Sequence, residues 1–255
     1  MYVHIVTIGW LTVFFDFPEA TFTTGTSFWQ AITQTTLSPL RGVSSEFSTL
    51  NPDRGDAYLR VQRIDQGVAG IHLDLHSDNV DATASEAQSL GATLRSQRPG
   101  LVILNSPGGL TFCVVEHREE RHRPAPSRWP AGYRSLVDQM CIDVPPNAFA
   151  EECMFWSRVT TWERHVGSRP EFEYLTRPAT IPLRLLLQRL DDESAEDCRA
   201  HLDLACDDVA SEQRRHEELG AVIERVTTNW TTLRDPAGLS YCITRRSPDT
   251  GTLQP

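Results

Sequence analysis

The sequence predicts an α+β fold made of four βαβββ modules, arranged as two tandem copies of a two-module domain. Three observations support this prediction. The stretch HLDL occurs twice, at 72–75 and 201–204. The residues around both stretches recur at the same spacing, which is typical of internal duplication. In both copies a strand-like alternation of apolar and polar residues is followed by a helical pattern and then by further strands.

The spacing of the repeated residues sets the register of the duplication. Cys113 in SPGGLTFCV follows His72 by 41 positions (113 − 72), and Cys242 in DPAGLSYCI follows His201 by 41 positions (242 − 201). The HLDL stretches are 129 residues apart (201 − 72). Further anchors recur in the same order, namely Asp16 and Asp143, Trp29 and Trp156, Gln62 and Gln188, and Gly91 and Gly220.

The second module of each copy begins with a half-buried strand, IHLDLHS or AHLDLAC. The following Asp-Asn and Asp-Asp pairs supply side chains that cap helices, so the segments VDATASEAQSLGA and VASEQRRHEELGA are expected to be helical. Gly91 and Gly220 come just after the last apolar position, where a left-handed residue ends a helix. Short strands, a turn and a closing strand, TFCVVE or SYCITR, complete the module.

The first module of each copy has the same order of elements. In copy one we expect a strand over VHIVTIGWLTVFFD, a helix around SFWQAITQ, and strands at EFSTL and YLRVQRID. The matching segments of copy two are VDQMCIDVP, EECMFWSRVTTW, EFEYL and PLRLLLQRL. The Phe-Trp pairs on the two helices are expected to pack between helix and sheet.

The charged, proline-containing segment between the copies is typical of a linker. We therefore predict domain 1 at residues 1–118, a linker at 119–132, and domain 2 at 133–248.

Composition argues against several classes of partner. A formal charge of −10 leaves no broad cationic surface for nucleic acid. The apolar segment 5–15 is too short to span a bilayer, so no membrane partner is expected. The six cysteines form no CxxC pair and are interpreted as free, mostly buried thiols. Free thiols favour a reducing compartment, and we expect a cytoplasmic protein.

Paired βαβββ modules, a strand that begins with His and ends at Asp, the LGA helix end and the DPxG turn resemble the vicinal oxygen chelate superfamily. That superfamily includes glyoxalase, the bleomycin-resistance proteins, the fosfomycin-resistance enzymes and the extradiol dioxygenases. The resemblance covers nearly the whole chain and is strongest at 58–116 and 183–246. It implies a curved half-barrel sheet with a cleft that holds the ligand and, in many members, a metal ion.

The resemblance implies which residues line each cleft. His72 and His201 match a metal ligand on the first strand of a module, whereas Cys113 and Cys242 stand where metal-using members have Glu. Gln62 and Gln188 match the last-strand position of the preceding modules. The predicted ligand-binding residues are therefore Gln62, His72 and Cys113 in one cleft and Gln188, His201 and Cys242 in the other. No catalytic residue is assigned.

Each predicted set contains no carboxylate, which disfavours a hard Mg²⁺ site. No metal ligand is assigned, and His72 and His201 are the candidates for one, with Zn, Fe, Ni or Mn as the candidate divalent ions. The alternative is structural, with the cysteines as small buried hydrophobes and a neutral polar floor for a ligand. Asp74 and Asp203 lie two residues after each His and share its face of the strand, so one interpretation is that they orient the imidazoles. We favour the other, that they are solvated or helix-capping, because Asp is seldom buried without a partner.

These residues leave two functions open, besides that of a scaffold with filled clefts. The main prediction is a protein that binds or sequesters an apolar or aromatic small molecule, as the bleomycin-resistance type does. The alternative is a metal-dependent lyase, isomerase or dioxygenase of the same superfamily, and the sequence does not decide whether the chain is an enzyme. Because the duplication already supplies four modules, we expect a monomer or a loose homodimer.

Overall fold

The structure is a computed structural model, and it describes residues 7–254. Copy one contains β1 (Ile8–Pro18), α1 (Glu19–Thr33), β2 (Thr36–Leu37), β3 (Phe47–Asn51), β4 (Leu59–Ile64), β5 (Gly70–Ser77), α2 (Val80–Ser89), β6 (Thr93–Arg98), β7 (Leu101–Asn105) and β8 (Thr111–Glu116). After β9 (Ser127–Arg128), copy two contains β10 (Arg134–Val144), α3 (Phe149–Thr160), β11 (Glu163–Val166), β12 (Phe172–Thr176), β13 (Arg184–Arg189), β14 (Arg199–Cys206), α4 (Val209–Glu218), β15 (Val222–Val226), β16 (Trp230–Arg234) and β17 (Ser240–Thr244).

The strands form two mixed sheets with the same order, which confirms the predicted α+β fold of two tandem domains. The first sheet runs β2-β3-β4-β1-β5-β8-β7-β6, and the second runs β11-β12-β13-β10-β14-β17-β16-β15. In each sheet the strand that carries HLDL pairs in parallel with the closing strand of its module, β5 with β8 and β14 with β17. These two parallel pairs position the candidate site.

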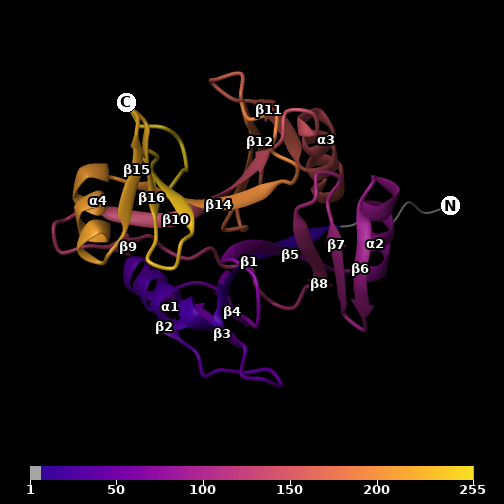
Figure 1. The fold of residues 1–255 in the computed structure, drawn as a ribbon, viewed down its shortest axis with the longest axis horizontal. Helices are drawn as coiled ribbons and strands as arrows, with labels where there is room; N and C mark the ends of the chain where they lie inside the picture. Colours follow the sequence, from indigo (N-terminus) through magenta and orange to yellow (C-terminus); the bar gives the residue numbers. More distant parts are fainter. Residues whose placement is uncertain (1–6, 255) are drawn as a thin grey trace. The chain divides into compact units, whose positions relative to one another are not determined.

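The contacts divide the chain into two compact units, and each unit contains one module from each copy. The first unit comprises residues 1–13, 72–122 and 141–200, and the second comprises 14–71, 123–140 and 201–255. In the first unit α2 and α3 lie beside each other near β7 and β8 (Figure 1). In the second unit α4 covers β16 and β17. The domain division at 1–118, 119–132 and 133–248 is a division of the sequence and stays a prediction.

The predicted helix boundaries of the second modules are confirmed. The side chains of Asn79 and Asp208 accept hydrogen bonds from the backbone N–H groups of Ala82 and Ser211, so both helices begin with a side-chain cap. After these helices Gly91 and Gly220 have φ angles of +103° and +97°. A side chain would strain the backbone in this left-handed region, which explains the glycines of the two LGA stretches.

The structure differs from the sequence-based expectation in the segment that joins the copies. Residues 127–128 form β9, which pairs with the start of β10. The Ser127 hydroxyl donates to the carbonyl of Thr33, and the Trp129 indole N–H donates to the Ser135 hydroxyl. Arg215 lies over the Trp129 ring at 3.4 Å from its centroid. These contacts fix part of the linker to the second unit. The predicted first strand extends to residue 3, and its residues 3–6 lie outside the described residues.

An aromatic cluster forms the core of the first unit. Phe112 on β8 packs edge-on against Phe155 and Trp156 on α3, with ring centroids 5.7 and 5.2 Å apart. Trp156 is fully buried, and its indole N–H donates to the carboxylate of Glu152 one turn earlier. Glu152 also accepts a hydrogen bond from the backbone N–H of Gly108. The predicted core position of this Phe-Trp pair is confirmed.

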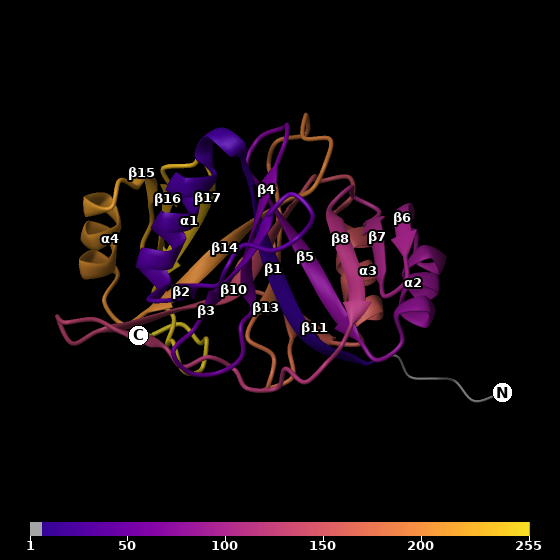
Figure 2. The ribbon, with the colours of Figure 1, turned by 90° about the horizontal axis from the view of Figure 1, so that it is seen from below.

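The second unit has the corresponding cluster around Trp29. The Trp29 ring packs 5.3 Å from that of Tyr241 on β17, and Phe28 lies 5.8 Å from the same ring, so α1 lies against β17 (Figure 2). The Trp29 indole N–H donates to Asp235 at 2.8 Å. The other oxygen of Asp235 accepts from the backbone N–H groups of Ala237 and Leu239.

The two copies thus supply the buried indole with different carboxylates. Copy two has Glu152 on the helix, where copy one has Gly25 (152 − 127). Copy one could not accept a side chain there, because a Cβ on Gly25 would lie 2.5 Å from the Phe17 ring. The acceptor of copy one instead comes from Asp235, at the turn where the other module has Ser106 (235 − 129). The difference between the turns SPGG and DPAG follows from this exchange.

None of the six cysteines forms a disulfide with another residue that the structure describes, and all six are buried. Among the described residues, no helix is long and apolar enough to cross a membrane.

Replacing Asp235 with Ser should destabilise the protein by about 1–3 kcal/mol, because it leaves the buried Trp29 indole N–H without an acceptor. Ser can still accept from the turn backbone, as Ser106 does from Leu110. Urea unfolding of D235S, W29F and the double variant forms the check. If D235S costs the same free energy in the W29F background, the hydrogen bond does not account for the effect.

Candidate functional site

The candidate site in the first unit is built on the parallel pair of β5 and β8. His72 and Asp74 are two residues apart on β5, so their side chains lie on the same face of the sheet. Cys113 on β8 is the register partner of Asp74. One ligand atom from each of the three residues lies within 4.8 Å of the others. The imidazole Nε2 of His72 is 3.8 Å from Oδ1 of Asp74.

The second unit repeats this arrangement on β14 and β17. His201 and Asp203 lie on β14, and Cys242 on β17 is the register partner of Asp203. Their ligand atoms also lie within 4.8 Å of one another. The imidazole Nε2 of His201 is 3.5 Å from Oδ1 of Asp203. The same three residue types are therefore grouped in each unit, at equivalent positions of the two copies.

The placement of Asp74 and Asp203 corrects the sequence-based expectation. Both were expected in solvent or at helix caps, and this is wrong because their exposed fractions are 6% and 4%. The caps are Asn79 and Asp208 instead. Each site thus has a carboxylate beside its His and Cys. The signal for it was in the sequence, because positions i and i+2 of a strand share a face.

The carboxylate of Asp203 has a defined partner on one oxygen only. Its Oδ2 accepts a hydrogen bond from the side-chain amide of Gln139 on β10. Its Oδ1 is buried and makes no hydrogen bond with any of the residues that the structure describes. The 3.5 Å separation from His201 is also too long for a hydrogen bond. A buried carboxylate oxygen without a donor is costly unless a cation or proton occupies the site.

The surroundings of Cys242 have opposing effects on the pKa of its thiol. Burial raises the pKa of this thiol, the charge of Asp203 raises it further, and the hydrogen bond and charge of His201 lower it in part. The Thr232 hydroxyl on β16 is 3.5 Å from the sulfur. Cys242 is therefore a protonated thiol that an adjacent cation would be needed to ionise.

The His–Asp separations are close to the spacing of two ligand atoms on one metal ion. Ligand atoms about 2.1 Å from a tetrahedral zinc ion lie about 3.4 Å apart. The His–Asp separations of 3.8 and 3.5 Å approach this length. A nucleophilic Cys–His–Asp relay would instead need the carboxylate to hydrogen-bond one ring nitrogen of the histidine and the thiol the other. The grouping of three ligand atoms within 4.8 Å of one another favours chelation over a relay.

The two predicted glutamines belong to different contact units from their expected partners. Gln62 lies on β4 in the second unit, opposite Phe47 of β3. Gln188 lies on β13 in the first unit, where its side-chain oxygen accepts a weak hydrogen bond from the Cys141 thiol at 3.8 Å. Their participation in the clefts of His72 and His201 stays a prediction.

A second buried polar cluster lies beneath α4 in the second unit. Glu212 and His216 are fully buried. Glu212 accepts hydrogen bonds from Arg215 and from the Tyr133 hydroxyl, at 2.8 and 2.9 Å. His216 Nδ1 is 2.8 Å from the Tyr241 hydroxyl. Every polar group of this cluster has a partner, so it is a structural network.

The histidine of this cluster is neutral. Burial lowers the pKa of His216, against an opposing effect of Glu212. Its Nε2 lies 3.0 Å from the Arg215 guanidinium and 3.2 Å from Oε1 of Glu212. Burial alone would raise the pKa of Glu212, but hydrogen bonds and the neighbouring positive charges lower it.

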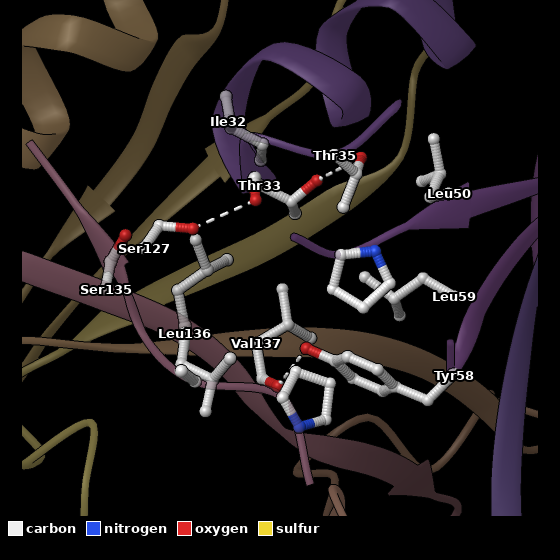
Figure 3. A pocket seen from close by; sticks show the side chains of 14 residues that line it. Ile32, Thr33, Thr35, Leu50, Tyr58, Leu59, Ser127, Ser135, Leu136 and Val137 are labelled. Carbon is white, nitrogen blue, oxygen red and sulfur yellow. Dashed lines mark hydrogen bonds between the residues drawn. The ribbon is translucent and has the colours of Figure 1, made fainter. Parts of the chain in front are cut away.

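A small pocket in the second unit lies apart from the candidate site. It is lined by the end of α1, by β3, β4 and β10, and by linker residues, with Tyr58 donating to the carbonyl of Val137 (Figure 3). Its cavity volume of about 20 Å³ holds one or two water molecules. Neither His201 nor Cys242 lines it. This pocket is too small for an organic substrate.

The fold and the repeated His, Asp and Cys groups define a tandem protein of paired βαβββ modules. Residues 12–115 and 139–244 match the family model of the glyoxalase-like domain, and the chain belongs to that family. The predicted membership of the vicinal oxygen chelate superfamily is thereby confirmed. A comparison with curated proteins finds no match.

Solved structures with the same fold include several dioxygenases. A 4-hydroxymandelate synthase variant from Streptomyces coelicolor superposes with a TM-score of 0.60 at 13% identity, covering 93% of this chain and 91% of that one. A catechol 2,3-dioxygenase gives 0.60 at 12% identity, covering 97% and 92%. A homoprotocatechuate 2,3-dioxygenase variant from B. fuscum, in complex with HPCA, gives 0.63 at 11% identity, covering 99% and 77%. At these identities the likeness establishes the fold alone.

The neutral, buried His216 predicts a loss of stability in mild acid. Its pKa is lowered in the folded state, so the unfolded chain binds the proton more readily. The stabilisation is fully present above about pH 6.5, the ordinary histidine pKa, and is lost as the pH falls below it. The free energy of unfolding between pH 7.5 and 5.5 should fall less steeply in H216Q. H122Q, at an exposed position, should keep the wild-type slope, and an unchanged slope in H216Q would contradict the assignment.

Proposed function

We propose that this protein is a metal-dependent enzyme that acts on a small molecule and holds a divalent ion between a His, an Asp and a Cys. The observation that carries the proposal is the convergence of these three residue types in each unit. The buried Oδ1 of Asp203 supports it, because a bound cation would satisfy this oxygen. The dioxygenases among the structural neighbours also favour an enzyme over the binding protein predicted as the main function.

The donor atoms suit some ions better than others. Imidazole nitrogen, carboxylate oxygen and cysteine sulfur are all zinc ligands, and three protein ligands with an open position are typical of catalytic zinc. Non-haem Fe(II) oxygenases use two histidines and one carboxylate. Each group here has one histidine, and the cysteine takes the place of the other. The residues therefore fit a borderline ion such as Zn²⁺ and depart from the iron triad.

This donor set favours a lyase or isomerase over a dioxygenase. A bound ion of this type polarises a carbonyl or stabilises an enolate oxygen and exchanges no electrons. In the second unit His201, Asp203 and Cys242 would hold it, and Gln139 would orient Asp203. The burial of Asp203 and Cys242 keeps water from these two ligands.

The sequestering role remains the second candidate. Aromatic side chains that could have stacked on a flat ligand are mostly in the core, since Trp10, Trp29 and Trp156 are fully buried and Trp162 is 6% exposed. Trp129 and Trp230 are half-buried, and the ring of Trp129 is covered by Arg215. This placement weakens the case for a hydrophobic sequestering cleft.

Titration with Co²⁺ tests the proposal, because thiolate ligation to cobalt gives a charge-transfer absorption in the near ultraviolet. We expect the full chain to develop this band and to bind up to two equivalents. C113A and C242A should each lose about half of the band, and the double variant should lose it entirely. C206A removes a buried cysteine outside both groups and should keep the full band.

Oxygen uptake tests whether the enzyme is a dioxygenase or a lyase or isomerase. The protein loaded with Fe²⁺, an ion that can activate oxygen, should consume no oxygen with catechol, whereas uptake at a steady rate would favour a dioxygenase. Failure of the full chain to bind Co²⁺ or Zn²⁺ at millimolar concentration would remove the metal site altogether.

A further inference from the structure

The two candidate metal groups differ in what surrounds them. In the second unit Gln139 connects Asp203 to a buried arginine. Arg246, which is 4% exposed, donates through Nη1 to the side-chain oxygen of Gln139 at 2.8 Å. The amide nitrogen of Gln139 donates in turn to Asp203 Oδ2. Arg246, Gln139 and Asp203 thus form a continuous chain of hydrogen bonds.

The direction of this chain is fixed by chemistry. An arginine side chain has only donors, so the atom of Gln139 that faces it must be the oxygen. The NH₂ group of Gln139 must then face Asp203, which makes Asp203 Oδ2 an acceptor. Arg246 is itself held by Asp138 Oδ1 at 2.5 Å and by the Thr244 hydroxyl at 3.0 Å. The amide of Gln139 is therefore oriented before any ion arrives.

The first unit has different residues at the corresponding positions. Thr12 stands where copy two has Gln139 (139 − 127), and its hydroxyl is 2.8 Å from Nε2 of His76. His117 stands where copy two has Arg246 (246 − 129). The ring of His117 contacts the carbonyl of Glu120 at 3.0 Å and the carboxylate of Asp78 at 3.4 Å. Neither residue can supply the amide and guanidinium that Gln139 and Arg246 supply.

The sulfur of Cys242 has a hydroxyl group beside it. Thr232 is the register partner of Cys242, and its hydroxyl can donate to the sulfur at 3.5 Å. A donor to the sulfur stabilises a thiolate, so this hydroxyl favours cation binding at Cys242.

We propose that the group of His201, Asp203 and Cys242 is the high-affinity metal site of the chain, with Gln139 and Arg246 as its positioning residues. The group of His72, Asp74 and Cys113 is then a weaker site. This inference rests on the proposed function, because it requires that the His, Asp and Cys groups bind metal. It adds that duplication has left the two sites unequal, and it assigns the difference to particular side chains.

The test measures Zn²⁺ affinity by competition with a chromophoric chelator, using the full chain in single-site form. C113A keeps the second-unit site, and C242A keeps the first-unit site. We expect C113A to bind Zn²⁺ at least about tenfold more tightly than C242A, since residues that orient metal ligands typically contribute 10- to 100-fold in affinity.

A substitution of Gln139, tested in both single-site backgrounds, provides its own control. Q139T, which introduces the residue of copy one, should weaken Zn²⁺ binding about tenfold in the C113A background and leave it unchanged in the C242A background. The cobalt–thiolate band of Cys242 should persist at saturation, because the ligand itself is retained. Circular dichroism reports whether each variant folds. R246K retains a cation that can donate to Gln139, so it should weaken binding less than R246H does.

The outcomes separate the two proposals. Equal affinities in C113A and C242A, or an equal loss from Q139T in both backgrounds, would overturn the inequality of the sites while leaving the metal-dependent function in place. An absence of Zn²⁺ binding in the wild-type chain would overturn the proposed function itself.

Discussion

A buried carboxylate beside a histidine and a cysteine is the constraint on which this account depends. Asp203 is 4% exposed, and its register partner across the parallel strands is Cys242. A carboxylate in such a place is unfavourable unless donors or a cation compensate for its loss of hydration. The amide of Gln139 provides part of this compensation. The remaining oxygen and the adjacent imidazole and thiol define the place that a cation would take.

Because the chain is duplicated, the buried carboxylate beside a histidine and a cysteine occurs twice. Because the two copies have diverged, the residues around it differ. The buried indoles show the same principle outside the site, since Trp156 bonds to a carboxylate on its own helix and Trp29 to one on a turn. In both cases the buried group is kept while its partner moves to a different element. A copy can therefore keep its three candidate ligands and still differ in the residues that would orient them.

Much of the fold could be predicted from the sequence because it depends on local patterns. Asn79 and Asp208 cap helices as their chemistry predicts, and Gly91 and Gly220 end them with positive φ. The candidate site is harder to predict from the sequence. His72 and His201 were recognised by their repetition, but the burial of Asp74 and Asp203 is set by neighbouring strands and loops that no local pattern encodes. Gln139 and Arg246 are 107 residues apart (246 − 139), so only the tertiary structure reveals their hydrogen bond.

X-ray absorption at the zinc edge of the loaded full chain tests the central claim most directly. A sulfur ligand lies farther from the zinc ion than a nitrogen or oxygen ligand does, so the measurement distinguishes sulfur from the lighter ligands. The account predicts one sulfur at about 2.3 Å together with nitrogen and oxygen at about 2.0–2.2 Å. A shell of nitrogen and oxygen alone, with zinc still bound, would show that the cysteines are not ligands and would contradict the account.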